Sequence, residues 1–159
     1  MIKNYLWIFF ISMVPLIELR GAIPVSQALQ MPIIPSYIVS IIGNMLPVPV
    51  IYFFARKVLE WGADKKFIGK IFTAILVKGT NAGQKIQEKA GKGFFIALFL
   101  FVGVPLPGTG AWTGTLAASL LGLSFKETVI AVILGVLLAG LIMMAGSLGL
   151  FTALFAISG

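Results

Sequence analysis

Hydrophobic residues dominate long stretches of the chain, and short clusters of proline, glycine and charge interrupt them. Residues 5–17 are apolar but make up only about two-thirds of the length of a membrane-spanning helix. Pro15, Gly21 and Pro24 are expected to interrupt helical continuity, and residues 22–30 form a second short helical segment. The pattern predicts a helical hairpin that enters the membrane and returns, with its irregular backbone surrounded by protein or water.

A run of spanning length follows this hairpin. Residues 36–55 are uncharged and predict a crossing helix, which the basic pair at 56–57 ends at the interface. Gly43, Pro47 and Pro49 lie inside the run, so a kink or an unwound turn is expected there.

The second half of the chain has a similar order of segments. Residues 94–104 form a short apolar run, and the proline- and glycine-rich stretch 105–114 (Pro-Leu-Pro-Gly-Thr-Gly-Ala-Trp-Thr-Gly) cannot be a regular helix. Residues 115–123 predict a short returning helix. Residues 128–159 are uncharged and long enough for a tilted crossing helix.

The middle of the chain is basic. Nine of the twelve basic residues lie there: Arg56, Lys57, Lys65, Lys66, Lys70, Lys78, Lys85, Lys89 and Lys92. The positive-inside rule places this connector in the cytoplasm. Apolar residues at helical spacing predict an amphipathic helix on anionic lipid, a turn at 79–83 and a second polar helix at 84–92. A nucleic-acid partner is not expected, because the segment lies between membrane segments and lacks a folded basic module.

The two halves of the chain share residues at matching places. The Val-Pro-Leu sequence at 14–16 recurs at 104–106, 90 positions later, whereas Leu29 and Leu121, and also Gly43 and Gly135, are 92 positions apart. If the connector is cytoplasmic, the halves have opposite orientations and both ends of the chain lie outside. Broken segments at matching positions of inverted halves indicate a transporter binding site near the midplane.

These patterns predict an all-α integral membrane fold. A single membrane domain, 1–159, contains a first repeat (1–55), the amphipathic connector (56–92) and a second repeat (93–159), each repeat being a re-entrant hairpin plus a transmembrane helix. The basic start resembles that of a signal peptide, but no convincing cleavage site follows, so it is interpreted as mature protein.

Composition agrees with a multi-pass protein of the plasma membrane. Hydrophobic residues make up 59% of the chain and charged residues 11%, about half the charged share of a soluble domain. The mean hydropathy is +1.06. Cysteine and histidine are absent, which excludes disulfides and the usual zinc sites and removes the commonest general base. We therefore expect no cofactor, no metal and no enzymatic activity.

Glu18 and Arg20 are the only charged residues between Asn4 and Ala55. A charge within the hydrocarbon costs at least about 2.5 kcal/mol, so the pair needs a reason to be there. One interpretation is a solvated pair in an interfacial loop. The functional interpretation places both near the hairpin tip, close to Pro24: Arg20 binds an anion through its planar fork, and Glu18 neutralises Arg20 and exchanges a proton, or binds an organic cation.

The stretch 105–114 is the expected partner of this pair. Glycine lets a ligand approach the backbone, and the N-terminus of a broken helix favours an anion. The alternative is a tight turn where helices cross closely. The candidate binding residues of this stretch are Gly108, Thr109, Gly110, Trp112 and Thr113.

Residues 18–24 (Glu-Leu-Arg-Gly-Ala-Ile-Pro), taken together with 105–114, resemble the small multidrug export proteins of bacteria and archaea. The chain is more distantly similar to the DedA superfamily, which implies two facing re-entrant hairpins and proton-coupled movement of polyprenyl phosphate or other lipids. In that likeness Glu18 matches the acidic residue of the first hairpin. The arginines usual in the second hairpin are absent, and Thr109 and Trp112 stand there instead, which weakens the case for a lipid phosphate.

The expected function is proton-coupled secondary transport, with export of an amphiphilic substrate, either a drug or a phosphate-headed lipid. The alternatives are a DedA-like lipid flippase and, from another class, a membrane scaffold or assembly factor that transports nothing. Membrane lipid is an expected partner. Glycines in the last segment suggest a homodimer, since small residues allow close helix packing.

Overall fold

The computed structural model describes residues 2–66, 68–90 and 93–158, and within these ranges every regular element is an α-helix. The parts of the predicted repeats and connector that fall on residues 1, 67, 91–92 and 159 lie outside the described residues. The helices are α1 (Ile2–Met13), α2 (Glu18–Ala28), α3 (Ile33–Met45), α4 (Pro47–Ala63), α5 (Gly69–Ala90), α6 (Gly93–Gly103), α7 (Ala111–Leu120) and α8 (Phe125–Ser158).

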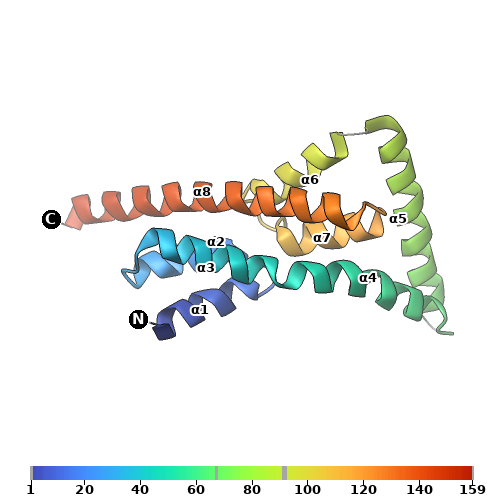
Figure 1. Cartoon of the computed structure of the whole chain (residues 1–159), viewed down its shortest axis with the longest axis horizontal. Coiled ribbons are helices and arrows are strands. Elements are labelled where there is room, and N and C mark those ends of the chain that lie inside the picture. The colour runs from blue at the N-terminus through green and yellow to red at the C-terminus, as the bar shows by residue number, and fades with distance from the viewer. Residues whose placement is uncertain (1, 67, 91–92, 159) are drawn as a thin grey trace.

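Among the described residues, two helical segments are long and apolar enough to cross a membrane. They are Ile33–Ala63, which comprises α3 and α4, and Phe125–Gly149, which is most of α8. At a rise of about 1.5 Å per residue, each exceeds the roughly 30 Å thickness of the hydrocarbon core. Figure 1 shows that the two segments run in opposite directions, with α5 across the end opposite to the start of α1 and the end of α8. The two crossing helices predicted from the sequence are therefore present as helices.

The break between α3 and α4 lies where prolines predict it. Leu46 is a turn residue between the two helices, and its N–H still donates to the Ile42 carbonyl (3.1 Å). Pro47 and Pro49 have no N–H to continue the ladder, which confirms the expected interruption. The segment is longer than predicted, however, because the basic pair 56–57 does not end the helix. A hydrogen-bonded Arg56–Glu60 pair lies within the last turns of α4.

Short helices α2 and α7 end in the same backbone motif. Gln30 (φ +54°) and Gly122 (φ +76°) occupy the left-handed position that follows each helix. The matching backbone hydrogen bonds, in which the donors and acceptors of the two halves are 92 positions apart, run from Met31 to Ser26 (3.0 Å) and from Leu123 to Ala118 (3.0 Å). These bonds define Schellman motifs, which satisfy carbonyls at a helix end.

The long helices α3 and α8 begin with the same type of side-chain hydrogen bond. Near the start of α3 the Ser36 hydroxyl donates to the Pro32 carbonyl (2.8 Å), and near the start of α8 the Thr128 hydroxyl donates to the Ser124 carbonyl (2.9 Å). The same local structure therefore occurs twice, 92 positions apart. This similarity supports the predicted repeat, whereas its inversion across a membrane and the re-entrant depth of the hairpins stay predictions.

Gly43 and Gly135 bring each long helix against the first short helix of its own half. A Cβ on Gly43 would lie 2.5 Å from the Phe9 carbonyl oxygen, and one on Gly135 would lie 2.9 Å from that of Phe99. Such distances are too short for any side chain, so glycine permits the close contact of α3 with α1 and of α8 with α6. The main buried core lies between α2, α6, α7 and α8.

Two breaks expected from the sequence are wrong. Gly21 and Pro24 do not interrupt the first hairpin, because α2 begins at Glu18 and includes both. The Gly21 N–H donates to Ile17 (2.9 Å), and Pro24 removes only one bond of the ladder. Ala22 and Ile23 are fully buried, so tertiary packing keeps this turn helical.

The turn expected at 79–83 is also wrong. Helix α5 runs without interruption from Gly69 to Ala90. Glycine inside a helix costs only about 1 kcal/mol relative to alanine, and the helix contains no proline. The connector therefore consists of the end of α4 and one long helix, rather than two helices and a turn.

Candidate functional site

The break between α1 and α2 ends at Glu18, a buried carboxylate. Leu16 (φ +71°) and Glu18 (φ +51°) adopt left-handed conformations that non-glycine residues rarely occupy. Only 3% of Glu18 is exposed. Backbone strain of this kind persists where the surrounding structure enforces it, which is common at functional sites.

Glu18 caps a helix of the other half of the chain. Its Oε2 accepts from the N–H of Ala111 (3.2 Å), and its Oε1 accepts from the N–H of Trp112 (3.0 Å). These are the first two residues of α7, where backbone N–H groups lack partners within the helix. The N-cap residue, Gly110, has no side chain to bind them. A carboxylate at this position is stabilised by both hydrogen bonds and the helix dipole.

Arg20 binds the other side of the same break. Its Nη1 donates to the carbonyls of Leu106 (2.6 Å) and Thr109 (2.8 Å), and its Nη2 donates to those of Val102 (3.0 Å) and Val104 (3.2 Å). These carbonyls lie at the end of α6 and in the break before α7. The guanidinium fork thus complements the negative end of α6 and organises the irregular backbone.

Trp112 makes the reverse connection. Its indole Nε1 donates to the carbonyl of Met13 (3.2 Å), the last residue of α1. The first hairpin therefore supplies two charged groups to the break of the second, and the second supplies an indole to the end of the first. The two hairpins are fastened together by side chains from both.

The sequence-based hypothesis paired Glu18 with Arg20, but in the described part of the chain these two side chains form no ion pair with each other. Each instead binds backbone groups of the second hairpin. Each terminal nitrogen of Arg20 donates to two of the four carbonyls. The structure thus shows Arg20 engaged with protein, and binding of an anion by this residue stays a prediction.

Gly110 lies directly against the Glu18 carboxylate. Its φ is +139°, and a Cβ at this position would lie 2.7 Å from Glu18 Cδ and closer still to one carboxylate oxygen. Gly108 also has a positive φ (+80°), but a Cβ there would meet nothing within 4 Å. Glycine at 110 is therefore needed for both conformation and space, and glycine at 108 for conformation alone.

A pocket of about 260 Å³ opens beside this junction. Its walls come from both breaks and from α4 and α7: Pro15, Leu16, Glu18, Ile51, Thr109, Trp112, Thr113 and Leu116. The hydroxyl groups of Thr109 and Thr113 donate to backbone carbonyls of their own break and first turn. Glu18 is the one charged residue among these wall residues.

A second hollow, of about 580 Å³, runs along α4 and α7 and reaches α5. Its walls are apolar: Pro47, Val50, Ile51, Phe54, Ala55, Val58, Leu59, Phe72, Trp112, Leu116 and Leu120. Ile51, Trp112 and Leu116 line both spaces. A small pocket containing a carboxylate thus adjoins a larger apolar groove.

The structure brings most of the predicted site residues together. Glu18, Thr109, Trp112 and Thr113 line the pocket, while Arg20 and Gly110 shape its break. Pro24 lies inside α2 and Gly108 lies in the break, and neither is among the pocket's wall residues. Four wall residues were missed: Pro15, Leu16, Ile51 and Leu116. For Ile51 and Leu116 the reason is that apolar residues in a membrane helix carry no signal that separates a pocket wall from a lipid-facing surface. Among the described residues no group of three His, Cys, Asp or Glu is placed to hold a metal.

Comparison with known families adds one finding. Residues 18–142 match the family model described as "Putative small multi-drug export protein", and because the match covers most of the chain, the chain belongs to this family. The family is named for export and not for an enzymatic reaction. No curated protein and no solved structure matches the chain. The resemblance to the DedA superfamily stays a prediction.

Proposed function

We propose that this member of the small multi-drug export family is a secondary transporter that exports an amphiphilic substrate in exchange for protons. One observation carries the proposal: the pocket that contains Glu18 shares three wall residues with the apolar groove along α4 and α7. An amphiphile has a polar group for the first space and an apolar body for the second. Concave, mostly apolar sites with a few polar groups are typical of small-molecule binding.

A cationic group fits the polar end best. Glu18 lines the pocket, whereas the Arg20 fork is directed at the four carbonyls of the second hairpin. A carboxylate binds either a proton or an organic cation, so the two compete for one site. This competition is the simplest basis for exchange of a cationic amphiphile for protons.

The proposed architecture is an inverted repeat of two re-entrant hairpins, α1–α2 and α6–α7, each followed by a crossing segment. The matching Schellman motifs and the opposite directions of α3–α4 and α8 support it (Figure 1). The excess of basic residues in the connector favours a cytoplasmic position for α5. In this arrangement the junction of Glu18 with α7 lies near the midplane of the plasma membrane, where transporters of this architecture bind substrate.

The same experiment tests two alternative functions. A lipid flippase of DedA type is favoured by the opening of the apolar groove along helices that would face lipid. A scaffold that transports nothing is favoured by the bonds of Glu18, Arg20 and Trp112, all of which hold the hairpins together.

The test is transport by purified protein in proteoliposomes with an imposed pH gradient. The cargo is a cationic dye in one arm and a polyprenyl phosphate in the other. Glu18→Gln keeps an oxygen that can accept from α7 but removes the charge. Glu60→Gln is the matched control, because it removes an exposed carboxylate whose ion pair contributes little.

The expected result is dye flux in the wild type and in Glu60→Gln, and background flux in Glu18→Gln. Full flux in Glu18→Gln would refute the role of the carboxylate. Flux of polyprenyl phosphate without dye flux would favour the flippase. Absence of both in folded wild-type protein would favour the scaffold.

A further inference from the structure

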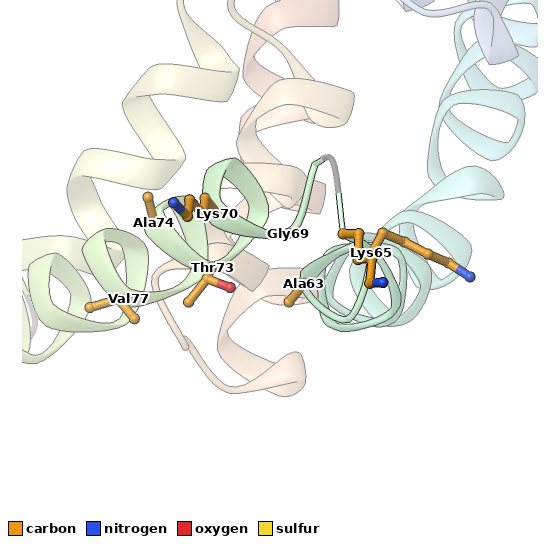
Figure 2. A pocket seen from close by; sticks show the side chains of 8 residues that line it. Ala63, Lys65, Gly69, Lys70, Thr73, Ala74 and Val77 are labelled. Atoms are coloured by element: carbon orange, nitrogen blue, oxygen red, sulfur yellow. The ribbon is translucent and has the colours of Figure 1, made fainter.

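A basic hollow that shares no wall residues with the pocket lies at the corner where α4 meets α5. It has a volume of about 550 Å³, and its wall residues are Ala63, Lys65, Lys66, Gly69, Lys70, Thr73, Ala74 and Val77. Figure 2 shows Ala63 and Lys65 on one side of the gap and Lys70, Thr73 and Val77 on the other. All charged wall residues are lysines, and three occur within six positions of the sequence.

Backbone hydrogen bonds connect described residues at the end of α4 and the start of α5. The Lys65 N–H donates to Gly62 (3.1 Å), and the Gly69 N–H donates back to Lys65 (2.7 Å). A Cβ on Gly69 would lie 3.3 Å from the carbonyl carbon of Ala63 and nearer to its oxygen, so glycine is required for this approach. Gly62 makes room in the same way for the ring of Phe72. Gly62 and Gly69 therefore allow the end of α4 and the start of α5 to pack closely.

Trp61 indicates where this corner lies relative to the membrane surface. It is 62% exposed, and the Lys65 ammonium lies 4.5 Å from its ring centroid. Exposed tryptophan with lysine at the end of a crossing helix is typical of the membrane–water interface, where lipid headgroups lie. The nearby acid Glu60 is paired with Arg56 (3.0 Å). Asp64 follows α4 but is not among the wall residues of the hollow.

The chemistry of the hollow suits a phosphate. Lysine ammonium groups bind phosphate as point charges, and the hydroxyl of Thr73 adds a donor. The N-terminal end of α5 contributes partial positive charge. Ala74 and Val77 form an apolar flank beside the basic groups. A lipid supplies both phosphate and apolar chains, whereas a soluble phosphate supplies only the first.

We propose that this corner is a binding site for the phosphate headgroup of an anionic membrane lipid. The site lies at the end of the Ile33–Ala63 segment and fixes the position of α5 against the adjacent leaflet. It does not depend on the transport proposed above, since none of its wall residues lines the substrate pocket or the apolar groove.

The experiment measures lipid retention by the full chain in detergent, with phosphatidylglycerol and phosphatidylcholine as probes. The variant replaces all three wall lysines: Lys65→Gln, Lys66→Gln and Lys70→Gln. The control makes the same charge change at exposed lysines elsewhere: Lys57→Gln, Lys78→Gln and Lys126→Gln. Thr73→Val, with every lysine intact, is a second variant with little risk to folding.

The wild type should bind phosphatidylglycerol at least about tenfold more tightly than the triple variant, while the control triple changes affinity by less than about threefold. Thr73→Val should weaken binding by about threefold. The proposal is overturned by an equal loss in both triples, by equal binding of phosphatidylcholine, or by full displacement of the lipid by equimolar inorganic phosphate. If the wall triple does not fold, unchanged binding in Thr73→Val overturns it.

Discussion

Arg20 and Trp112 lie 92 positions apart and hold the two hairpins together in a reciprocal way. Arg20 Nη2 donates to the Val102 carbonyl near the end of α6 (3.0 Å), and Trp112 Nε1 donates to the Met13 carbonyl at the end of α1 (3.2 Å). The same separation relates the Schellman motifs of α2 and α7. Each half of the chain therefore satisfies the exposed carbonyl end of the other half's first helix, although one does so with a cation and the other with an indole.

Arg20 should contribute more to stability than any surface arginine. In Arg20→Ala four carbonyls lose the bonds from the guanidinium, although those of Val104 and Leu106 keep the Thr109 hydroxyl, so the free energy of unfolding should fall by about 2–4 kcal/mol. At this chain length that corresponds to a melting temperature lower by about 5–15 °C. Arg20→Lys keeps the charge but reaches fewer carbonyls, so its free energy of unfolding should lie between those of the wild type and Arg20→Ala. Thermal unfolding in detergent measures the effect.

Arg56→Ala is the control for this series, because Arg56 is exposed and has one ion pair with Glu60. It should change stability by less than about 1 kcal/mol. Equal melting temperatures for Arg20→Ala and Arg56→Ala would show that the carbonyl contacts do not stabilise the hairpins.

The two glycines of the second break provide a matched pair. Gly108→Ala imposes only conformational strain, expected to cost about 1 kcal/mol, since nothing lies near its Cβ. Gly110→Ala adds a clash with the Glu18 carboxylate and should displace it from the N–H groups of Ala111 and Trp112. Loss of dye flux together with a larger fall in melting temperature is expected for Gly110→Ala only. Equal dye flux in the two variants would contradict the close contact of Gly110 with the Glu18 carboxylate.

The sequence predicted several of the breaks between helices, but not all of them. Prolines at 15, 47 and 105 mark real interruptions, because each lacks the N–H that a continuing helix needs. Gly21 and Pro24 gave the wrong signal, since the burial of Ala22 and Ile23 keeps α2 helical. Local propensity is a weak guide where tertiary packing decides.

The candidate site was predictable in its residues but not in their partners. Two charges in an apolar segment indicated Glu18 and Arg20, and residues 105–114 indicated a break, although 111–114 are helical because α7 begins at Ala111 and not at 115. The pairing of a side chain with a distant backbone carbonyl or N–H has no sequence signal, because every residue other than proline carries both groups. The natural assumption that Glu18 pairs with Arg20 therefore overlooked the helix ends of the second hairpin.

Trp112 should have separable structural and binding roles. Trp112→Phe loses the hydrogen bond to Met13 but keeps an aromatic wall between the pocket and the groove, so stability should fall by about 0.5–1.5 kcal/mol with dye affinity nearly unchanged. Trp112→Ala removes the shared wall and should weaken dye binding about tenfold or more. Fluorescence titration with the dye measures affinity. Equal loss of affinity in both variants would contradict a wall role for the ring.

The opposite placement of α5 and of the start of α1 leads to a topology prediction (Figure 1). The chain has no cysteine, so single substitutions provide unique labels without a background. Lys78→Cys in α5 should react with a membrane-impermeant maleimide only from the cytoplasmic side, because the basic connector follows the positive-inside rule. Lys3→Cys in α1 should react only from outside. Lys126→Cys, at the start of α8, should be labelled from the same side as Lys78→Cys, since α8 begins near the end occupied by α5.

Right-side-out and inverted vesicles measure labelling from the outside and from the cytoplasmic side. Labelling of Lys3→Cys and Lys78→Cys from the same side would exclude the inverted arrangement, because both halves of the chain would then begin on the same side of the membrane.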